Sequence, residues 1–405
     1  MTEKKYERYY DLAGKASFEN QKSVRESRMC GCYYCRRVFP ASEVTEWISD
    51  ARGGTAVCPY CSIDSVLGDA AGIPLQEDVL EEIHAFMFGG PEPQEPRAAR
   101  CVGSGNYFLD TVVVREYPDG PAARKFTEKT VMKEVGGTCG NVMCMLSHFG
   151  HAVYPQACLD DSPEGLKITA DLKRYGCDTR FVTNTPDGGT TLLRVTHKLN
   201  PDGTPKVSVR VGSPGGSRFP KKKFLRVKDQ APAFVDALTA EFIPDFYFFD
   251  DPAAGHRYIA RELRTMGATV WFEPAAVRTK ADLECVALSD IVKFSGEQIP
   301  DTSFTEGFRD KLFIQTLGKD GLRYKLRDGD WKTLPPVPNE HAVDWEGAGD
   351  WTSAAFIAGL ADSGLKFADL DEDTVRRGLA EAQRCASESV SYLGPKGGIR
   401  ALYPE

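Results

Sequence analysis

The chain of 405 residues lacks the long apolar runs that would place it in a membrane. No segment approaches the ~20 consecutive apolar residues needed to span a bilayer. Residues 1–30 are polar and charged, without the apolar core of a secretory signal. We therefore expect a cytoplasmic protein that does not bind membranes.

The sequence also lacks an excess of positive charge. Its 50 Lys and Arg residues stand against 58 Asp and Glu residues, which gives a formal net charge of −8 at pH 7. This balance disfavours nonspecific binding of the whole molecule to nucleic acid or anionic membranes. With 41% hydrophobic residues the chain can bury a sizeable core, and its length predicts one large and one small domain.

Several common site signatures are missing. The chain has no Gly-x-x-x-x-Gly-Lys-Ser/Thr phosphate loop, and its six histidines include no His-Glu-x-x-His pair. Gly103-Ser104-Gly105 lacks the third glycine of a dinucleotide-binding fingerprint. These absences disfavour three large classes of enzyme: P-loop proteins, dinucleotide-binding oxidoreductases and zinc proteases.

Cysteine is concentrated near the N-terminus, where five of the twelve cysteines fall in residues 30–61. Four of them form two Cys-x-x-Cys pairs separated by 22 residues: Cys32, Cys35, Cys58 and Cys61. Each pair can present two thiolates to one tetrahedral ion, so the spacing predicts a closed structural Zn²⁺ site. The alternative is a redox pair or disulfides, which a reducing cytosol disfavours. Cys30 is not included among the predicted ligands.

The residues around these cysteines resemble small bacterial zinc-ribbon-like proteins. The likeness rests on Cys30–Cys35, Glu43–Ile48 and Cys58–Val66. It implies a fold and a metal, but neither an activity nor a partner. Apolar residues at helical spacing follow and predict one amphipathic helix: Val79, Leu80, Ile83, Phe86 and Met87.

A linker separates the two parts of the chain. Gly89–Arg100 contains three prolines and two glycines in twelve residues, a composition typical of a semi-extended connection. We therefore predict a zinc-ribbon-like domain with its flanking helix over residues 1–88, a linker over 89–100 and a larger domain over 101–405.

Beyond the linker, short apolar runs alternate with helical patterns. Four runs predict buried strands: Phe246–Phe249, Thr269–Phe272, Ile291–Phe294 and Leu312–Gln315. Repeated strand–helix–strand units predict a parallel sheet with helices on both faces. Ligands bind beyond the C-terminal ends of the strands in such sheets.

The stretch Gly347-Ala348-Gly349-Asp350 lies directly before a helical pattern. A glycine-rich turn at a helix start gathers unpaired N–H groups and the positive end of the helix dipole, which suits a phosphate or a developing anion. Asp350 has a reference pKa near ~3.9, so we expect it to be ionised and able to accept a proton from an attacking hydroxyl. Together they suit phosphoryl transfer to an alcohol. The alternative is an ordinary tight turn capped by the aspartate.

Residues 101–405 resemble the ribokinase-like (PfkB-type) sugar and nucleoside kinases. The resemblance rests on five segments in the family's order and spacing: Val102–Asp110, Gly136–Asn141, Leu159–Gly165, Thr316–Gly321 and Val343–Asp350. It implies ATP-dependent phosphorylation of a sugar, sugar derivative or nucleoside. It also implies a ribokinase-like three-layer α/β/α sandwich with a small β lid.

The same resemblance gives roles to individual residues. Asp350 would be the general base, beside an anion hole formed by Gly347, Ala348 and Gly349. The residues implied to hold the substrate are Asp110, Gly136, Gly137 and Asn141. The residues implied to lie against ATP and Mg²⁺ are Thr316, Gly318, Gly321, Ser295 and Glu297.

The sequence departs from the family pattern in two places. Trp345 replaces the usual threonine beside Asp344, where the family often places a monovalent cation. Ser295 and Gln298 replace the asparagine and glutamate of a metal-orienting Asn-x-x-Glu motif, with Glu297 as a substitute carboxylate. These departures support an alternative function: a ligand-sensing or nucleic-acid- or protein-binding regulatory protein with a degenerate kinase fold.

Residues around 111–130 and 181–225 are the predicted lid. Thr190–Val195 and Lys206–Val211 alternate polar and apolar residues, and Asn200–Gly203 between them is a strong turn sequence. In the related kinases a small sheet closes over the sugar and often forms the dimer interface, so we expect a homodimer through the lid. The following Lys221–Lys223 is interpreted as a solvated loop rather than a phosphate contact.

Overall fold

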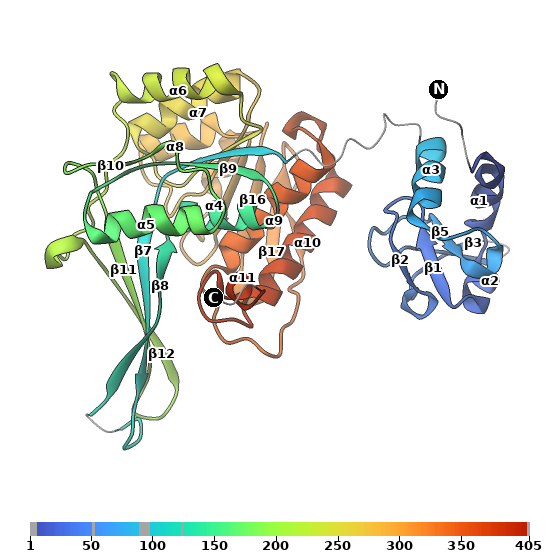
Figure 1. Cartoon of the computed structure of the whole chain (residues 1–405), viewed down its shortest axis with the longest axis horizontal. Helices are drawn as coiled ribbons and strands as arrows, with labels where there is room; N and C mark the ends of the chain where they lie inside the picture. Colours follow the sequence, from blue (N-terminus) through green and yellow to red (C-terminus); the bar gives the residue numbers. More distant parts are fainter. Residues whose placement is uncertain (1–5, 51–52, 89–97, 123–124, 403–405) are drawn as a thin grey trace. The chain divides into compact units, whose positions relative to one another are not determined.

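The computed structural model describes residues 6–50, 53–88, 98–122 and 125–402 (Figure 1). The chain forms two compact units, Met1–Pro96 and Arg97–Glu405. Residues 89–97 of the predicted linker lie outside the described residues. In the described part of the chain, no helix has both the length and the apolar character that crossing a membrane requires.

The described residues of the first unit form two small antiparallel sheets, three α-helices and three short 3-10 helices. Its strands are β2 (Val38–Pro40), β1 (Met29–Cys32) and β5 (Val66–Gly68) in one sheet, and the hairpin of β3 (Trp47–Asp50) and β4 (Gly53–Ala56) in the other. Its helices are α1 (Tyr10–Ala16), α2 (Gln21–Glu26) and α3 (Glu77–Phe88). The predicted amphipathic helix is α3, which buries Val79, Leu80 and Ile83 against α1 and the β5 region.

The second unit is built on a nine-stranded sheet. Its strands, in spatial order, are β10 (Val182–Asn184), β9 (Ala152–Leu159), β6 (Arg100–Ser104), β13 (Phe246–Phe249), β14 (Thr269–Phe272), β15 (Ile291–Ser295), β16 (Leu312–Thr316), β17 (Leu322–Leu326) and β18 (Lys332–Leu334). The first seven are parallel, as predicted, whereas β17 and β18 are antiparallel. The sheet is therefore mixed, because a tight turn rather than a helix connects β16 to β17.

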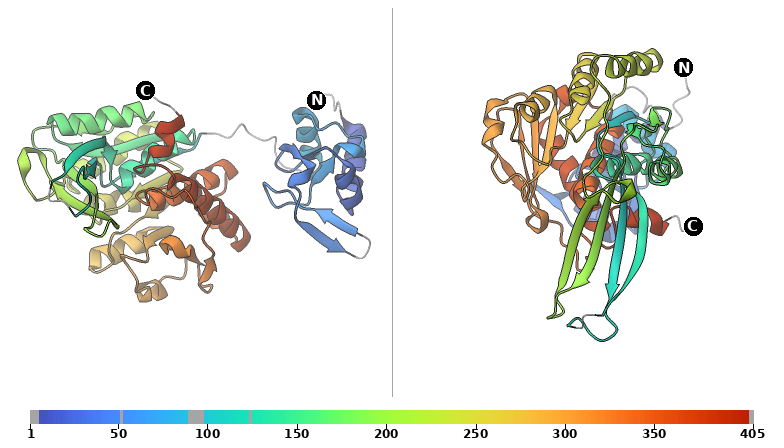
Figure 2. Two further views of the ribbon diagram at one scale, coloured as in Figure 1. Left: turned by 90° about the horizontal axis from the view of Figure 1, so that it is seen from below. Right: turned by 90° about the vertical axis from the view of Figure 1, so that its left-hand side faces the viewer.

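Helices cover both faces of this sheet (Figures 1 and 2). One face packs against α4 (Thr138–His148), α5 (Pro163–Arg174), α9 (Ala348–Ser363), α10 (Glu372–Ser389) and α11 (Gly397–Leu402). The other face packs against α6 (Gln230–Glu241), α7 (Ala254–Thr265) and α8 (Lys280–Leu288). Alternate strand residues supply the two cores: Phe246 and Phe248 belong to the first, Tyr247 and Phe249 to the second. The predicted three-layer sandwich is confirmed.

A separate four-stranded sheet projects from the sandwich (Figures 1 and 2). Its order is β12 (Pro205–Gly212), β11 (Thr191–Leu199), β7 (Phe108–Glu116) and β8 (Thr127–Gly136). It occupies the two predicted lid regions, and a turn at Asn200–Gly203 closes the β11–β12 hairpin. The β7–β8 hairpin is joined to the sandwich at both ends, since β7 follows β6 and β8 precedes α4.

Candidate active site and candidate metal centre

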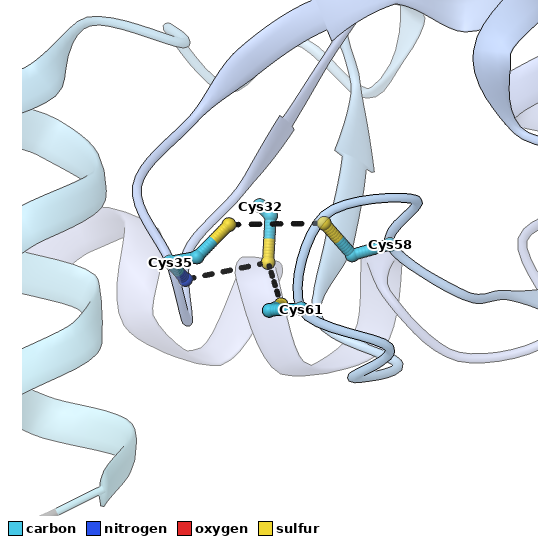
Figure 3. A group of neighbouring side chains, drawn as sticks. All are labelled: Cys32, Cys35, Cys58 and Cys61. Carbon is cyan, nitrogen blue, oxygen red and sulfur yellow. Dashed lines mark hydrogen bonds between the residues drawn. The ribbon is translucent and has the colours of Figure 1, made fainter. Parts of the chain in front are cut away.

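The four predicted cysteine ligands converge in the first unit (Figure 3). Their sulfur atoms all lie within 4.8 Å of one another. The Sγ atoms of Cys32 and Cys61 are 3.6 Å apart, and those of Cys35 and Cys58 are 3.7 Å apart. Zn–S bonds of ~2.3 Å in a tetrahedron require sulfur separations of about 3.8 Å. The four thiols therefore fit one zinc ion, and Cys30 does not belong to the cluster.

The two cysteine pairs are held by turns of matching geometry. The N–H of Arg36 donates to the Cys32 carbonyl (2.6 Å), and the N–H of Ser62 donates to the Cys58 carbonyl (2.9 Å). Arg36 and Ser62 each stand four residues after the first cysteine of their pair, with φ of 62° and 58°. Left-handed backbone is uncommon for residues other than glycine. Its repetition at equivalent positions shows that each Cys-x-x-Cys pair forms a turn, or knuckle, of the same backbone conformation.

In the second unit, the predicted anion hole lies at the start of α9. Gly347 has φ of 80°, and a Cβ there would stand 2.5 Å from Pro395, so glycine is required. Because glycine has no side chain, no side-chain cap competes with an anion for the N–H groups of the first turn. The N–H of Ala348 already donates to the Trp345 carbonyl at 3.3 Å.

Asp350 lies in this first turn and is half-buried. The Nδ2 atom of Asn141, on α4, donates to its Oδ2 at 2.7 Å. Burial and the nearby Glu273 raise the pKa of Asp350 to about 7, against the lowering effects of Lys293, Asn141 and Lys396. This corrects the expectation of full ionisation at neutral pH, because the sequence alone does not show the burial of the carboxyl group.

A buried ion pair contacts the glycine-rich start of α9. Lys293 on β15 is 2% exposed and pairs with Glu273, which follows β14. Its Nζ also donates to the Gly349 carbonyl (2.7 Å), and the Ser353 hydroxyl donates to Glu273 (2.6 Å). These residues were not predicted from the sequence. The lysine inside the apolar run Ile291–Phe294 is the signal that points to them, since buried charges need partners.

The predicted substrate residues meet where β7 lies beside the end of β8. Asp110 is 5% exposed, and a Cβ on Gly136 would stand 1.7 Å from its Oδ2. Burial raises the pKa of Asp110 to about 6, although Lys396 and the Gly137 N–H lower it. Its Oδ1 has no hydrogen-bond partner among the described residues. A buried acceptor without a donor suits a substrate hydroxyl.

Asp250, which was also not predicted from the sequence, holds the turn that leads into α4. It follows β13 and accepts hydrogen bonds from the N–H groups of Asn106 (2.8 Å) and Cys139 (3.0 Å). A Cβ on Gly105 would stand 2.0 Å from its Oδ1. The hydrogen bond to Cys139 holds the start of α4, the helix that carries Asn141 and has Gly137 as its N-cap.

The predicted nucleotide residues lie at the C-terminal edge of the sheet. Ser295 and Thr316 end the parallel neighbours β15 and β16 and are partners in register. Gly318 and Gly321 have φ of 58° and 90° in the turn before β17. Glu297 is exposed in the turn after β15, and the structure does not bring it to another predicted site residue through any described bond. Among the described residues only the four cysteines form a group of three or more possible metal ligands.

The three lysines of the lid loop have carboxylate partners. The ion pairs join Lys221 to Asp160 (3.4 Å), Lys222 to Asp251 (3.3 Å) and Lys223 to Asp187 (3.0 Å). All three side chains keep at least 35% of their surface exposed. These contacts agree with a solvated loop.

Comparison with known proteins connects this site to sugar kinases. Residues 275–401 match the pfkB family of carbohydrate kinases. The 2-dehydro-3-deoxygluconokinase of Bacillus subtilis is 25% identical over 62% of this chain and 80% of its own length. The fructokinase of Klebsiella pneumoniae is 32% identical over 33% of this chain and 44% of its own length.

Solved structures show the same fold. A fructokinase with bound ATP from Xylella fastidiosa superposes with a TM-score of 0.55 at 16% identity, covering 73% of this chain and 93% of that chain. At this identity the likeness concerns the fold alone. The family match begins before α8 and ends within α11, so it includes the glycine-rich start of α9. The second unit of this chain therefore has a ribokinase-like fold, and its C-terminal part is similar to the pfkB family of carbohydrate kinases.

Proposed function

We propose that the protein transfers the γ-phosphoryl group of ATP to a hydroxyl group of a sugar or sugar derivative. The arrangement of Asp350 carries this proposal: it lies at an uncapped helix start and is held by Asn141. The relatives named as kinases of 2-dehydro-3-deoxygluconate and of fructose support a sugar acceptor. A nucleoside is the other acceptor class that the family resemblance implies.

The chain's own residues account for the steps of this transfer. The ionised carboxylate of Asp350 takes the proton of the attacking hydroxyl as its oxygen bonds to the γ-phosphorus and the bond from that phosphorus to the bridging oxygen breaks, which releases ADP. The N–H groups of the first turn of α9 stabilise the negative charge on the transferring group. Asp110 and Asn141 hold the remaining hydroxyls and so fix the orientation of the sugar. When bound beside Ser295 and Thr316, Mg²⁺ with ATP would neutralise phosphate charge.

In the part of the chain that the structure describes, only the four cysteines form a group of three or more possible metal ligands. We therefore infer that Mg²⁺ is held by the nucleotide's phosphates and water with at most one or two protein carboxylates, as is common for this ion. A monovalent cation at Asp344 remains a prediction. Both oxygens of that carboxylate accept backbone hydrogen bonds, from the N–H groups of Glu346 (3.1 Å) and Gly394 (2.9 Å).

The pH dependence of the reaction follows from the buried base. Asp350 must be ionised to accept a proton, and its pKa lies at about 7. We expect kcat/KM to rise through an acid limb centred near that value and to be roughly tenfold lower one pH unit below it. A pH–rate profile with saturating ATP measures this. A rate that stays flat down to pH 5 would rule out a base with this pKa.

We also propose that two copies associate through the projecting sheet. The edge strand β12 carries three valines on one face, Val207, Val209 and Val211, which are 49%, 54% and 41% exposed. Exposed apolar residues on an edge strand favour a protein contact. Val209→Glu should weaken the dimer by at least ~10-fold. Light scattering measures the mass: a dimer is expected for wild type and a monomer for the variant, and a monomeric wild type contradicts the proposal.

The regulatory alternative predicts binding without turnover. Residues 1–88 contain 10 Lys and Arg against 14 Asp and Glu, a net charge of −4. This charge disfavours nucleic acid as the partner of the first unit. ADP release measured against a panel of sugars separates the two functions, because a sensor binds its ligand but releases no ADP.

A further inference from the structure

The most deeply buried cation near the active site is a lysine that has no role so far. Lys396 lies in the loop before α11 and is 0% exposed. Its Nζ donates to the Oδ1 of Asn141 at 2.5 Å and to the Val135 carbonyl at 2.7 Å. Glu134 Oε1 stands 3.6 Å from the same nitrogen.

We propose that Lys396 is a positioning residue that fixes the side-chain amide of Asn141 and thereby holds Asp350 as the proton-accepting carboxylate. This inference rests on the proposed role of Asp350 as general base. The three side chains form one continuous series of hydrogen bonds, from Lys396 to Asn141 and from Asn141 to Asp350. They come from a C-terminal loop, α4 and α9, which only the fold brings together.

The orientation of the amide is the centre of this inference. An asparagine side chain has one acceptor oxygen and one donor nitrogen, whereas a lysine ammonium can only donate. Lys396 therefore requires the oxygen of Asn141 to face it, which leaves the Nδ2 group facing Asp350. An N–H donor stabilises an ionised carboxylate. With the amide reversed, its oxygen would instead favour the protonated acid, which cannot serve as a base.

Charge acts in the same direction as the hydrogen bonds. The charged groups that face Asp350 are Glu273, which favours its protonated form, and the two lysines Lys293 and Lys396, which favour its ionised form. Cys139 on α4 also faces Asp350, but burial raises the pKa of its thiol, so it is neutral. Without Lys396, the charged neighbours of the half-buried Asp350 carboxyl group would be one cation, Lys293, and one anion, Glu273.

The surroundings explain how an ammonium is tolerated at this depth. Glu134 is its counter-ion, and Arg400 and the Tyr175 hydroxyl (2.7 Å) hold that carboxylate in place. Burial opposes its charge, but Lys396 and Arg400 lower the pKa of Glu134 overall. A buried pair with satisfied partners is stable, whereas removal of one member is costly. Asp110 lies close enough for Lys396 to lower its pKa as well.

The test is a pH titration of Asp350. Carbon NMR monitors it on protein labelled at the aspartate side-chain carboxyl carbon. Asp350→Asn identifies the resonance by its disappearance. In Lys396→Met we expect the midpoint to rise by about one pH unit, because both the cation and the amide orientation are lost. Lys311→Met is the matched control, because Lys311 is also buried (1% exposed) and donates to backbone carbonyls. It directly precedes β16 and so lies at the N-terminal end of that strand, whereas the candidate site lies at the C-terminal ends of the strands. Loss of Lys311 should leave the midpoint unchanged.

The kinetic measurement is the acid limb of kcat/KM. Lys396→Met should move this limb upward by the same amount, with activity recovering at high pH. An unmoved resonance in Lys396→Met overturns the inference whatever the activity. A moved resonance without sugar phosphorylation by wild type supports the positioning role and refutes the proposed function. If Lys396→Met does not fold, Asn141→Leu carries the test, and an unchanged midpoint there equally overturns the inference.

Discussion

Asp350→Asn is expected to lower kcat by about 10²–10⁴-fold, the usual contribution of a general base. The amide has the size of the carboxyl group and keeps an oxygen that can accept the hydrogen bond of Asn141, which is 2.7 Å long in the wild type. It cannot take a proton from the attacking hydroxyl. Binding of ATP and sugar should therefore stay within a few-fold of wild type. Steady-state kinetics and calorimetric titration measure the two effects separately.

Asp362→Asn is the matched control for this variant. Asp362 lies on the same helix, α9, but its side chain is 60% exposed, so the same change should leave kcat unaltered. Near-normal turnover in Asp350→Asn would contradict the assignment and direct attention to Glu346. Burial, Asp344 and Asp110 raise the pKa of Glu346 to about 7, which makes it the next base to examine.

Replacing Cys58 and Cys61 together with serine is expected to release zinc and to unfold residues 30–66. Zinc binding to four thiolates is worth ~10–16 kcal/mol in small folds. The described core around the cluster is small: its eight buried residues include the ligands Cys32 and Cys58 themselves. It therefore cannot stabilise the folded segment without the metal. Elemental analysis should show one zinc per chain in wild type and none in the variant, and amide NMR should show the loss of structure.

Cys30→Ala is the matched control for the metal centre. Cys30 lies on β1 beside the cluster but outside the group of four ligands, and burial raises the pKa of its thiol to about 11. The variant should keep one zinc per chain. Unchanged metal content in the double serine variant would refute the site, and zinc loss in Cys30→Ala would show that the ligand set is wrong.

The sequence predicted those parts of the sites whose residues lie close together in the chain. Each Cys-x-x-Cys pair builds its own knuckle within a single turn, so its spacing alone predicts the ligands. The glycine-rich start of α9 is similar, because Gly347 and Asp350 are fixed by one helix turn. The strands were predicted by their apolar runs, which supply two cores on opposite faces of the sheet.

What the sequence did not predict depends on contacts between distant segments. Lys396 meets Asn141 across 255 residues, and Lys293 meets Gly349 across 56. No sequence spacing indicates that residues so far apart will be in contact. The raised pKa of Asp350 has the same origin, since burial is a property of the packed structure. The strands β17 and β18 were not among the predicted ones, because Leu322–Leu326 and Lys332–Leu334 contain charged residues and form no apolar run.

The most direct test of the central claim is the identification of a phosphorylated sugar by mass spectrometry after incubation with ATP and Mg²⁺. The proposed function predicts a sugar phosphate that forms with wild-type protein and in far smaller amount with Asp350→Asn. ATP binding without any phosphorylated product, across sugars, sugar acids and other derivatives, would contradict a sugar kinase and favour the ligand-sensing alternative.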